Sequence, residues 1–402
     1  EVIGAKMADF TRLFTLEQGR PLAKASEELM GAAFWAGHVA TQDIPVLVSE
    51  DTPERRAETR RVPIGVVGAI VPWNFPMLLG VWKIAGALLT GNTLVIKPSP
   101  YTPLTILKLG ELMRPHLPPG VLNVVSGGDA LGPWMTAHPG IDKISFTGST
   151  ATGKRVMASA AQSLKRITLE LGGNDAAIVL GDVDVAAVAG PLFWSAFVNS
   201  GQVCIATKRL YVHDTVYDAL AAELTAIAER VRMGDGLAPG SELGPIQNRP
   251  QYDRVRALIA DARDAGLRFL TGGDVPDGKG YFIPVTLVDN PPEDSRVVAE
   301  EAFGPVLPLI RFTDVDDVIA RANASPYGLA GSVWSADVDA AQAIAARLDT
   351  GTVWINEAQH VAPWLPFGGH KQSGIGIENG VEGLMEYTNA QTIMVRKPVV
   401  AA

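Results

Sequence analysis

The sequence contains little cysteine, no long apolar run and no basic cluster, and each shortage excludes a class of protein. One cysteine in 402 residues cannot form an internal disulfide, which favours a reducing compartment, so we expect a cytoplasmic protein. Apolar runs such as 64–71 and 77–82 are too short to span a bilayer, which argues against a membrane protein. A net charge of −9, without runs of Lys or Arg, argues against a nucleic-acid partner.

What the chain does contain is typical of a globular protein with a large core. Hydrophobic residues make up 47% of the chain and charged residues 19%. Its 402 residues exceed the size at which single cores stop growing, so two domains are expected. Residues 2–18 and 21–40 already have helical spacing, and the sequence has no start Met or signal-like opening before them. We therefore expect the sequence to begin inside a longer protein.

Short β-rich runs alternate with segments of helical spacing in the rest of the first half. The runs cover 65–71, 93–96, 121–125 and 143–146, and the helical segments between them cover 77–89, 102–114 and 130–137. Buried runs that alternate with helices predict βαβ units and a parallel sheet. A second series of the same kind follows. The fold class is therefore α/β, a doubly wound, Rossmann-like domain plus a second α/β domain.

Two segments lie outside this pattern. Residues 44–49 and 59–63 alternate like strands, and the charged stretch 50–58 between them is predicted to be their turn. Their exposed character suits a hairpin outside the core that pairs with another subunit. The end of the chain, 387–396, reads as a strand on an arm.

The single cysteine, Cys204, follows Gly201 and Gln202 and is flanked by apolar residues. A thiolate is a strong nucleophile near neutral pH, and a small, flexible approach segment suits a reacting carbon that comes close to the backbone. Taken alone, the cysteine is better explained as a small buried apolar residue, because free Cys is among the most buried residue types. Other stretches of the chain decide between the two readings. No group of residues predicts a metal site.

Two polar side chains follow buried strands in the first series. Asn74 lies in a turn bounded by Pro72 and Pro76, from which its amide could donate to an oxygen that gains negative charge. Lys97 ends the run 93–96, and ligands of open α/β sheets bind beyond the carboxyl ends of the strands. Taken alone, each residue is better explained as an ordinary turn or loop residue.

Three more stretches add polar groups to the same picture. The segment 146–153 places a Gly-Ser-Thr turn at the start of a helix, where free N–H groups favour a phosphate. Glu170 stands between two leucines after a strand, where burial would raise its pKa and suit a general base. Glu301 and Phe303 lie in a turn that could bind sugar hydroxyls and a flat ring.

Together, in this order and spacing, these motifs make the chain resemble the aldehyde dehydrogenase superfamily over nearly its whole length. The resemblance implies a cofactor-binding domain at 1–43, 63–172 and 356–385, and a catalytic domain at 173–355. It also implies an oligomerisation element at 44–62 and 386–398, and therefore a homodimer or homotetramer. The motifs that carry it are 72–76, 97–99, 146–150, 169–173, 201–204, 301–305 and 366–369.

The resemblance also implies a role for each matching residue. Cys204 is the expected nucleophile, Glu170 the general base, and Asn74 with the Cys204 backbone N–H the oxyanion hole. Lys83 and Glu378 match positions that some members use to relay protons away from the base. The residues expected to bind NAD or NADP are Trp73, Lys97, Ser99, Phe146, Gly148, Ser149, Leu171, Glu301 and Phe303. The residues expected to line the substrate tunnel are Phe75, Leu79, Trp82, Val203, Ile205, Trp364 and Phe367.

The expected reaction is NAD(P)-dependent oxidation of a small-molecule aldehyde to a carboxylic acid. Cys204 adds to the carbonyl, a hydride leaves to the cofactor, and Glu170 activates the water that hydrolyses the thioester. Pro100 stands where many NAD-preferring members have a Glu, so NAD is expected first and NADP is also possible. An apolar tunnel favours medium-chain or aromatic aldehydes. The alternatives are acyl transfer to coenzyme A and a catalytically weak structural or binding member of the fold.

Overall fold

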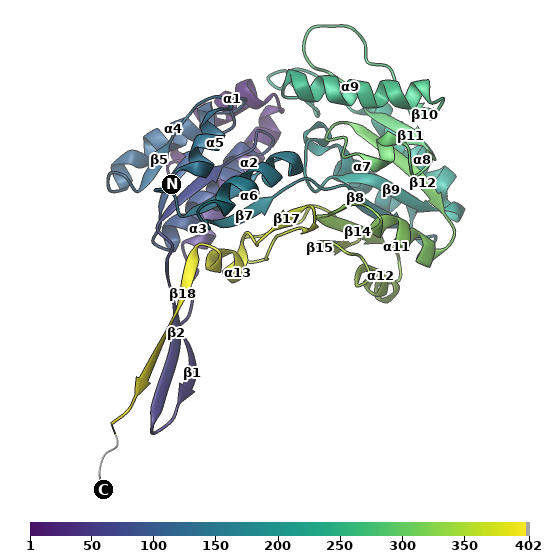
Figure 1. Cartoon of the computed structure of the whole chain (residues 1–402). Helices are drawn as coiled ribbons and strands as arrows, with labels where there is room; N and C mark the ends of the chain where they lie inside the picture. The colour runs from purple at the N-terminus through teal and green to yellow at the C-terminus, as the bar shows by residue number, and fades with distance from the viewer. Residues whose placement is uncertain (399–402) are drawn as a thin grey trace.

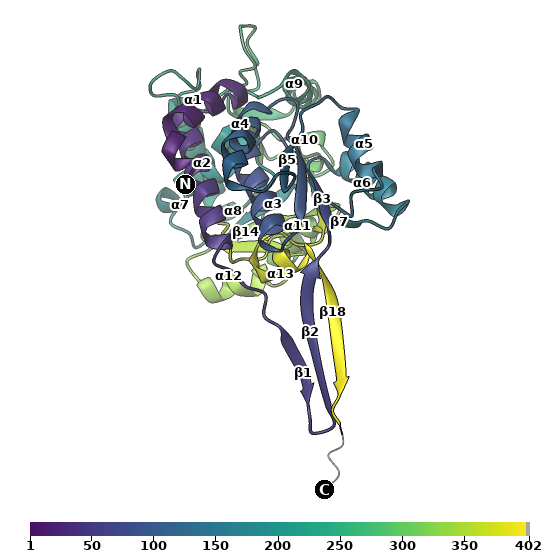
Figure 2. The same cartoon turned by 90° about the vertical axis from the view of Figure 1, so that its left-hand side faces the viewer.

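The computed structural model describes residues 1–398, and over this range the chain forms two α/β lobes and a projecting arm (Figure 1). The first part of the chain, together with a short C-terminal portion, builds one lobe, and the green segments of Figure 1 build most of the other. A view at right angles shows the arm extending away from both lobes (Figure 2). The α/β fold class predicted from the sequence is confirmed. Within residues 1–398, no helix combines the length and the apolar composition that crossing a membrane requires.

The first lobe contains a six-stranded sheet that is parallel except for one edge strand. In order across the sheet, the strands are β17 (Gly374–Ile375), β7 (Arg166–Glu170), β6 (Lys143–Thr147), β3 (Val66–Ile70), β4 (Thr93–Lys97) and β5 (Leu122–Val124). All five residues of the central strand β6 are buried, as expected where helices cover both faces of a parallel sheet. The helical segments of this lobe are η1 (Gly4–Lys6), α1 (Met7–Gln18), α2 (Leu22–Val39), α3 (Pro76–Leu89), α4 (Leu104–Met113), η2 (Arg114–His116), α5 (Leu131–Ala137), α6 (Thr150–Ala161) and α13 (Gly380–Met385).

The second lobe contains a seven-stranded sheet, again parallel except for one edge strand. In order, the strands are β10 (Arg268–Thr271), β11 (Thr286–Asp289), β12 (Val306–Phe312), β9 (Thr207–His213), β8 (Asp175–Val179), β14 (Ala330–Trp334) and β15 (Thr352–Ile355). The helical segments are α7 (Val185–Phe197), η3 (Val198–Gly201), α8 (Asp214–Arg230), α9 (Arg249–Asp264), α10 (Arg296–Ala299), α11 (Val315–Asn323) and α12 (Val338–Ala345).

The chain after β15 joins the two lobes. β16 (His370–Lys371) pairs with β13 (Tyr327–Gly328), whereas β17, three residues further on, pairs antiparallel with β7 of the first sheet. Gly172 and Gly173 form the direct crossing from β7 to β8. The ends of β7 and β8 that flank this crossing therefore lie where the two sheets meet.

The arm is a three-stranded antiparallel sheet of β1 (Leu47–Asp51), β2 (Arg55–Pro63) and β18 (Thr388–Arg396). The predicted turn at 50–58 is wrong, because the turn is confined to 52–54 and the charged residues after it belong to β2. These charges pair across the strands: Asp51 accepts from Arg56 at 2.8 Å and from Lys397 at 2.6 Å. A charged stretch can therefore be a strand here, since both faces of the arm meet water.

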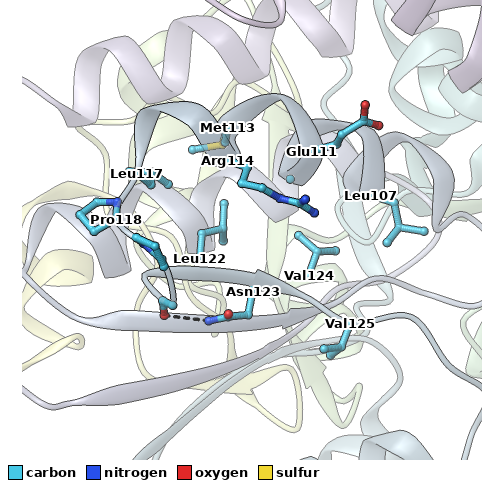
Figure 3. A pocket seen from close by; sticks show the side chains of 13 residues that line it. Leu107, Glu111, Met113, Arg114, Leu117, Pro118, Leu122, Asn123, Val124 and Val125 are labelled. Atoms are coloured by element: carbon cyan, nitrogen blue, oxygen red, sulfur yellow. Dashed lines mark hydrogen bonds between the residues drawn. The ribbon is translucent and has the colours of Figure 1, made fainter.

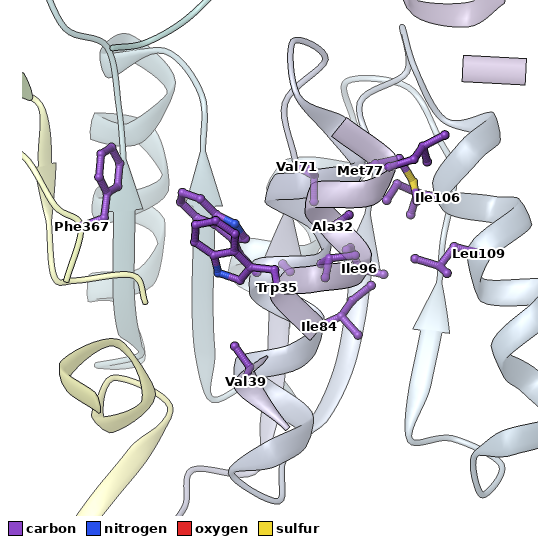
Figure 4. Close-up of a cluster of buried hydrophobic side chains, with 14 of the residues drawn as sticks. Ala32, Trp35, Val39, Val71, Met77, Ile84, Ile96, Ile106, Leu109 and Phe367 are labelled. Carbon is purple, nitrogen blue, oxygen red and sulfur yellow. The ribbon is translucent and has the colours of Figure 1, made fainter. Parts of the chain in front are cut away.

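Three aromatic side chains connect the core of the first lobe to the segment that crosses between the lobes. Figure 4 shows side chains of α2 and α3 gathered in this cluster, with Phe367 at its border. Trp35 of α2 stacks on Trp82 of α3, with ring centroids 4.9 Å apart, and Trp82 meets Phe367 edge-on at 5.8 Å. Such aromatic pairs add about 0.5–1.5 kcal/mol beyond the area they bury. The stack holds α3 against the segment that crosses between the lobes.

Candidate active site

The turn that carries Cys204 has a strained backbone. After α7, Asn199 and Ser200 adopt left-handed conformations with φ of 53° and 55°, and Gly201 follows with φ of 73°. Non-glycine residues rarely adopt this region, and such strain persists only where the surrounding structure holds it. A side chain at position 201 would place its β-carbon 2.2 Å from the Gly304 carbonyl oxygen, so only glycine fits. The cysteine turn therefore packs directly on the Phe303–Gly304 turn.

Side-chain hydrogen bonds hold this strained turn in place. Ser200 donates to the Gly244 carbonyl at 2.7 Å, and the Gln202 amide donates to the Asn199 carbonyl at 2.8 Å. The Gln202 side-chain oxygen accepts from the Gln247 backbone N–H at 2.9 Å. Gln202 thereby fixes the direction in which the chain enters Cys204, and the side chain of Cys204 itself is partly buried.

Asn74 lies opposite the cysteine turn and is rigidly held. Its side-chain amide donates one hydrogen bond to the Gln202 carbonyl, with 3.1 Å between nitrogen and oxygen. Its own carbonyl accepts from Asn199 at 3.2 Å and from the buried guanidinium of Arg20. Glu28 pairs with Arg20 and also accepts from two backbone N–H groups at the start of α3. Among residues 1–398, the second N–H of the Asn74 amide has no hydrogen-bond partner and can donate to a ligand.

Arg20 is a residue that the sequence reading missed. The sequence showed it only as part of a Gly-Arg-Pro break between two helices, whereas the structure buries it to 3% exposure, and its guanidinium lies 4.4 Å from the Phe75 ring centroid. An isolated buried charge is very costly, so its ion pair with Glu28 is required for this packing. Nothing in the local sequence signals this pair, because its partners come from α2 and the turn before α3.

Glu170 ends β7 and is 4% exposed. Within residues 1–398, its Oε1 atom has no hydrogen-bond partner, although the atom is buried. Burial raises the pKa of Glu170 well above its ordinary value, the negative charge of Glu378 raises it further, and Lys83 opposes the rise. A buried carboxyl with an unused oxygen is suited to take and release a proton.

Lys83 and Glu378 form an ion pair behind Glu170. Their charged atoms lie 2.6 Å apart, and both side chains are almost completely buried. The Ser145 hydroxyl is shared by both partners and by the Tyr387 hydroxyl, at distances of 2.9, 3.1 and 3.2 Å respectively. The two charges predicted from the sequence are thus brought together, and the structure adds Ser145 and Tyr387 to the cluster.

Two cavities meet at Cys204. One, of about 140 Å³, is lined by Pro72, Trp73, Asn74, Thr147, Gly148, Ser149, Leu171, Gly172, Cys204, Gln251, Arg254, Glu301 and Phe303. The other, of about 220 Å³, is lined by Asn74, Phe75, Leu78, Leu79, Trp82, Thr147, Glu170, Leu171, Val203, Cys204, Ile205, Gln359, Val361 and Phe367. The first contains six of the nine residues predicted for the cofactor, and the second is mostly apolar. Cys204 and Asn74 belong to both, and Glu170 faces the apolar one.

The polar cavity is shaped by the turns that carry its predicted residues. Ser149 caps α6 by accepting from the Thr152 N–H at 3.3 Å. Glu301 accepts from the Gly173 N–H at 3.1 Å. Phe303 has a left-handed backbone, with φ of 49°, and its ring meets Trp73 edge-on at 5.4 Å. The strained Phe303 turn therefore places an aromatic edge beside the cysteine.

Some predicted residues do not line either cavity. Trp364, expected in the substrate tunnel, is 51% exposed and packs on Phe34 and His38 of α2, with ring centroids 6.3 and 5.1 Å away. Trp364 therefore lies outside the described lining of the apolar cavity, because its side chain packs on α2 while Phe367, three residues later, lines the cavity. Lys97, Ser99 and Phe146 also lie outside the described linings of the two cavities.

Another hollow lies away from this site. It has a volume of about 550 Å³ and lies between α4 and the edge strand β5, where Asn123 donates to the Gly120 carbonyl at 2.8 Å (Figure 3). The described lining of this hollow includes none of the residues predicted to act in catalysis or binding.

Burial raises the pKa of the Cys204 thiol to about 12. Lys208 opposes this rise, whereas Glu170, Asp175 and Glu301 add to it through their negative charges. The thiol is therefore protonated at neutral pH without a ligand, and the thiolate forms only when its proton is removed. The reactivity of Cys204 should accordingly increase as the pH rises.

The arrangement of a thiol, an amide donor and a buried carboxyl at two joined cavities can be compared with known proteins. The aldehyde dehydrogenase family model matches residues 1–393. The chain belongs to the aldehyde dehydrogenase family. Its general reaction is therefore the oxidation of an aldehyde, as the sequence predicted.

Relatives and solved structures of aldehyde dehydrogenases match nearly the whole chain. A putative aldehyde dehydrogenase, FUS7, of Gibberella fujikuroi is 44% identical over 97% of this chain and 82% of its own length. The phenylacetaldehyde dehydrogenase of Pseudomonas fluorescens is 40% identical over 98% and 81%. The NAD+ complex of the Bacillus cereus aldehyde dehydrogenase superposes with a TM-score of 0.95, at 36% identity, covering 98% and 81%. An E. coli NADP-dependent enzyme superposes with a TM-score of 0.94, at 37% identity, covering 98% and 84%.

The sequence reading of this aldehyde dehydrogenase missed several residues that line its cavities. Thr147 belongs to both cavities, and Gln251 and Arg254 of α9 close the polar one. The Gln251 amide donates to the Phe303 carbonyl at 3.0 Å, which supports the strained turn. Thr147 could have been found, since it ends a strand beside Glu170, whereas α9 gave no signal because its amphipathic pattern is that of any surface helix.

Asn74→Ala is expected to lower the turnover number by about a hundredfold or more, because a fixed donor to a developing oxyanion contributes on that scale. The KM for the aldehyde should change little, since the donor acts mainly in the transition state. Steady-state kinetics with the purified variant test this. Asn199→Gly shows what loss of the surrounding contacts alone does: it removes the amide that bonds the Gln202 and Asn74 carbonyls, leaves the Asn74 side chain in place, and Gly tolerates the left-handed backbone. A change within threefold for Asn74→Ala would remove this residue from the mechanism.

Proposed function

We propose that this protein oxidises an aldehyde to a carboxylic acid with NAD(P), using Cys204 as nucleophile, Glu170 as general base and Asn74 as oxyanion donor. The observation that carries the proposal is the position of Cys204, which is shared by a polar cavity and an apolar cavity. A nucleophile at such a junction can contact an aldehyde on one side and a hydride acceptor on the other. Asn74 lies at the same junction and Glu170 lines the apolar side.

The residues of the polar cavity fit a dinucleotide. The N-terminus of the 12-residue helix α6 opens at Ser149, and free N–H groups there favour a phosphate. Glu301 offers a carboxylate for ribose hydroxyls, and Phe303 with Trp73 forms an aromatic wall for a flat ring. We propose that Lys97, Ser99, Phe146, Gly148 and Leu171 complete this site. The bound nicotinamide would supply the hydride acceptor.

The protein's own groups account for the remaining steps. The Cys204 thiolate forms a bond to the carbonyl carbon, and the carbonyl oxygen gains the negative charge that Asn74 stabilises. Loss of hydride leaves a thioester on Cys204. Glu170 removes a proton from water, the resulting hydroxide adds to the thioester, and the C–S bond breaks to release the acid and the thiolate. Lys83 and Glu378, whose charges act on Glu170, would pass the proton onward.

The apolar cavity favours an apolar aldehyde. Phe75, Leu79, Trp82, Val203 and Phe367 surround it, and its described lining has no cationic side chain that would bind a second carboxylate. A phenylacetaldehyde dehydrogenase is among the relatives, whereas a Staphylococcus aureus betaine aldehyde dehydrogenase is more distant, at 34% identity. We therefore propose an aromatic or medium-chain aldehyde as substrate.

NAD is the cofactor that we propose, with NADP as a second possibility. Solved structures with similar folds include both an NAD+ complex and an NADP-dependent enzyme. Pro100 follows β4 and is exposed, so no carboxylate at that position would repel a 2′-phosphate. We also propose that the arm joins two or four copies of the chain, and that the enzyme works in the cytoplasm.

An aldehyde panel with each cofactor tests the proposal. Phenylacetaldehyde and octanal should have higher kcat/KM than betaine aldehyde or succinic semialdehyde, and NAD should give higher rates than NADP, measured by the absorbance of the reduced nicotinamide. Added coenzyme A should not change the product from the free acid. Preference for the charged aldehydes would overturn the substrate assignment, and no turnover of any aldehyde would overturn the proposed function.

A further inference from the structure

Lys208 is a buried cation directly beneath the cysteine turn. It lies on β9, is 4% exposed, and its ammonium donates to the carbonyl oxygen of Cys204 at 2.5 Å. It also lies 3.5 Å from Oε1 of Glu301. Lys is almost never fully buried unless it is paired, because removing an ammonium from water is costly. It also donates to the Ala206 carbonyl at 3.4 Å, and its other two partners, Cys204 and Glu301, belong to the proposed active site.

The oxygens that contact this ammonium come from two separate segments of the chain. The carbonyls of Cys204 and Ala206 belong to the segment after η3, and Glu301 belongs to the turn before β12. Asp175, at the start of β8, lies next to them without a direct bond to the ammonium. A β-carbon at Gly173 would lie 2.9 Å from the Cys204 carbonyl oxygen and 2.6 Å from Asp175 Oδ1, so both oxygens face the same point of the Gly173 backbone. The Gly173 N–H donates to Glu301, which closes the cluster.

Asp175 shows that the cluster is electrostatically coupled. Burial raises the pKa of Asp175 to about 7, the charge of Lys208 lowers it, and Glu301 raises it. Arg209, the next residue on β9, lowers it more weakly. Within residues 1–398, Asp175 Oδ2 has no hydrogen-bond partner. The charge of Lys208 therefore lowers the pKa of Asp175, although the two side chains are not directly bonded.

The charges that act on the thiol of Cys204 are unequal in number. Three carboxyl groups, those of Glu170, Asp175 and Glu301, disfavour a thiolate, and Lys208 is the cation among the described residues that favours it. A nearby positive charge favours the ionised form of a thiol. Without Lys208, the sulfur would be surrounded by acids alone, and the Glu301 carboxylate would lose its cationic partner.

We propose that Lys208 is a positioning residue with two effects: its charge favours ionisation of Cys204, and its ion pair holds the Glu301 carboxylate in the cofactor cavity. The proposal rests on the proposed function, because it treats Cys204 as the nucleophile. Lys208 acts through Cys204 and Glu301 and does not itself contact the substrate. One buried ammonium thereby links the nucleophile to the cofactor site.

Alkylation of Cys204 by iodoacetamide measures the first effect without any aldehyde or cofactor. The chain has one cysteine, so the mass increase of the intact protein reports this thiol alone. Lys208→Gln retains a donor for the Cys204 carbonyl and removes the charge. Its profile of log rate against pH should move to higher pH, so that alkylation near neutral pH becomes about tenfold slower. Lys208→Arg, which keeps the charge, should stay within threefold of the wild type.

Steady-state kinetics measure the second effect. In Lys208→Gln the KM for the cofactor should rise severalfold while the KM for the aldehyde stays nearly constant. Lys165→Gln is the matched control, because Lys165 is also a buried lysine that donates to two carbonyls, at 2.7 and 2.6 Å. It lies in the turn before β7, and its loss should lower the melting temperature without moving the alkylation profile.

The outcomes separate this inference from the proposed function. If wild-type Cys204 is alkylated and Lys208→Gln follows the same pH profile with the same KM for the cofactor, the proposed role of Lys208 is rejected. If wild-type Cys204 resists alkylation at every pH, the assignment of Cys204 as nucleophile is rejected. Lys208→Met is a second neutral variant of similar length, and it decides the result if Lys208→Gln does not fold.

Discussion

Cys204→Ala is expected to abolish aldehyde oxidation, with a fall in kcat of more than about ten-thousandfold, as when the nucleophile of a covalent mechanism is removed. No other thiol exists in the chain, so none can replace it. The cavities on either side of residue 204 should persist, because their walls come from the surrounding turns. The loss should therefore appear in kcat, with binding of the cofactor retained.

The fold of Cys204→Ala provides the control for this prediction. The side chain is partly buried and small, so its truncation should cost about 1 kcal/mol of unfolding free energy or less. The strained residues Asn199 and Ser200 are held by Gln202 and Gly244, which the substitution leaves in place. Thermal unfolding and titration with NAD test both points. Turnover at the wild-type rate by a folded variant would reject Cys204 as the nucleophile.

The sequence predicted the sheets well because parallel strands buried on both faces are short, continuous and apolar. The runs that became β3, β4 and β6 differ from the predicted bounds by one residue at most at each end. The grouping of Asn74 with Glu170 came instead from the family resemblance, and in the structure both line the apolar cavity. The antiparallel edge strand β10 escaped notice, because half of its surface is solvated and its residues lack an apolar run.

Contacts between distant segments could not be predicted. The pair of Arg20 and Glu28 holds Asn74, and Lys208 joins Cys204 to Glu301, yet each of these charges looks in sequence like an ordinary polar residue. Trp364 shows that the direction of a side chain is equally hard to predict. It lies three residues from Phe367, and this spacing does not tell which of the two faces the cavity, because the chain between them is a turn. Burial, and therefore the chemical role, depends on the tertiary packing.

Glu170→Gln is expected to stall the enzyme after the first oxidation. Gln has nearly the same shape but cannot accept a proton, so the thioester on Cys204 should form and then persist. General base catalysis typically contributes about a hundred- to ten-thousandfold, and the deacylation rate should fall within that range. Intact mass after mixing with NAD and phenylacetaldehyde should show the protein plus one acyl group, together with a burst of one reduced nicotinamide per active site.

The double variant Cys204→Ala/Glu170→Gln is the control, and it should show neither the adduct nor the burst. If Glu170→Gln turns over normally and accumulates no adduct, Glu170 is not the base.

The raised pKa of Glu170 adds an independent signature in both rate and stability. The carboxyl is protonated below its folded-state pKa, so wild-type deacylation should accelerate as the pH rises, while the slow deacylation of Glu170→Gln should lack this acceleration.

The stability of the folded protein should change with pH in the opposite direction to the deacylation rate. An acid whose pKa is raised by folding stabilises the native state below its unfolded pKa and loses that contribution as the pH rises through the folded value. The melting temperature of the wild type should therefore fall relative to Glu170→Gln as the pH increases, and a constant difference would show that Glu170 is not a desolvated carboxyl.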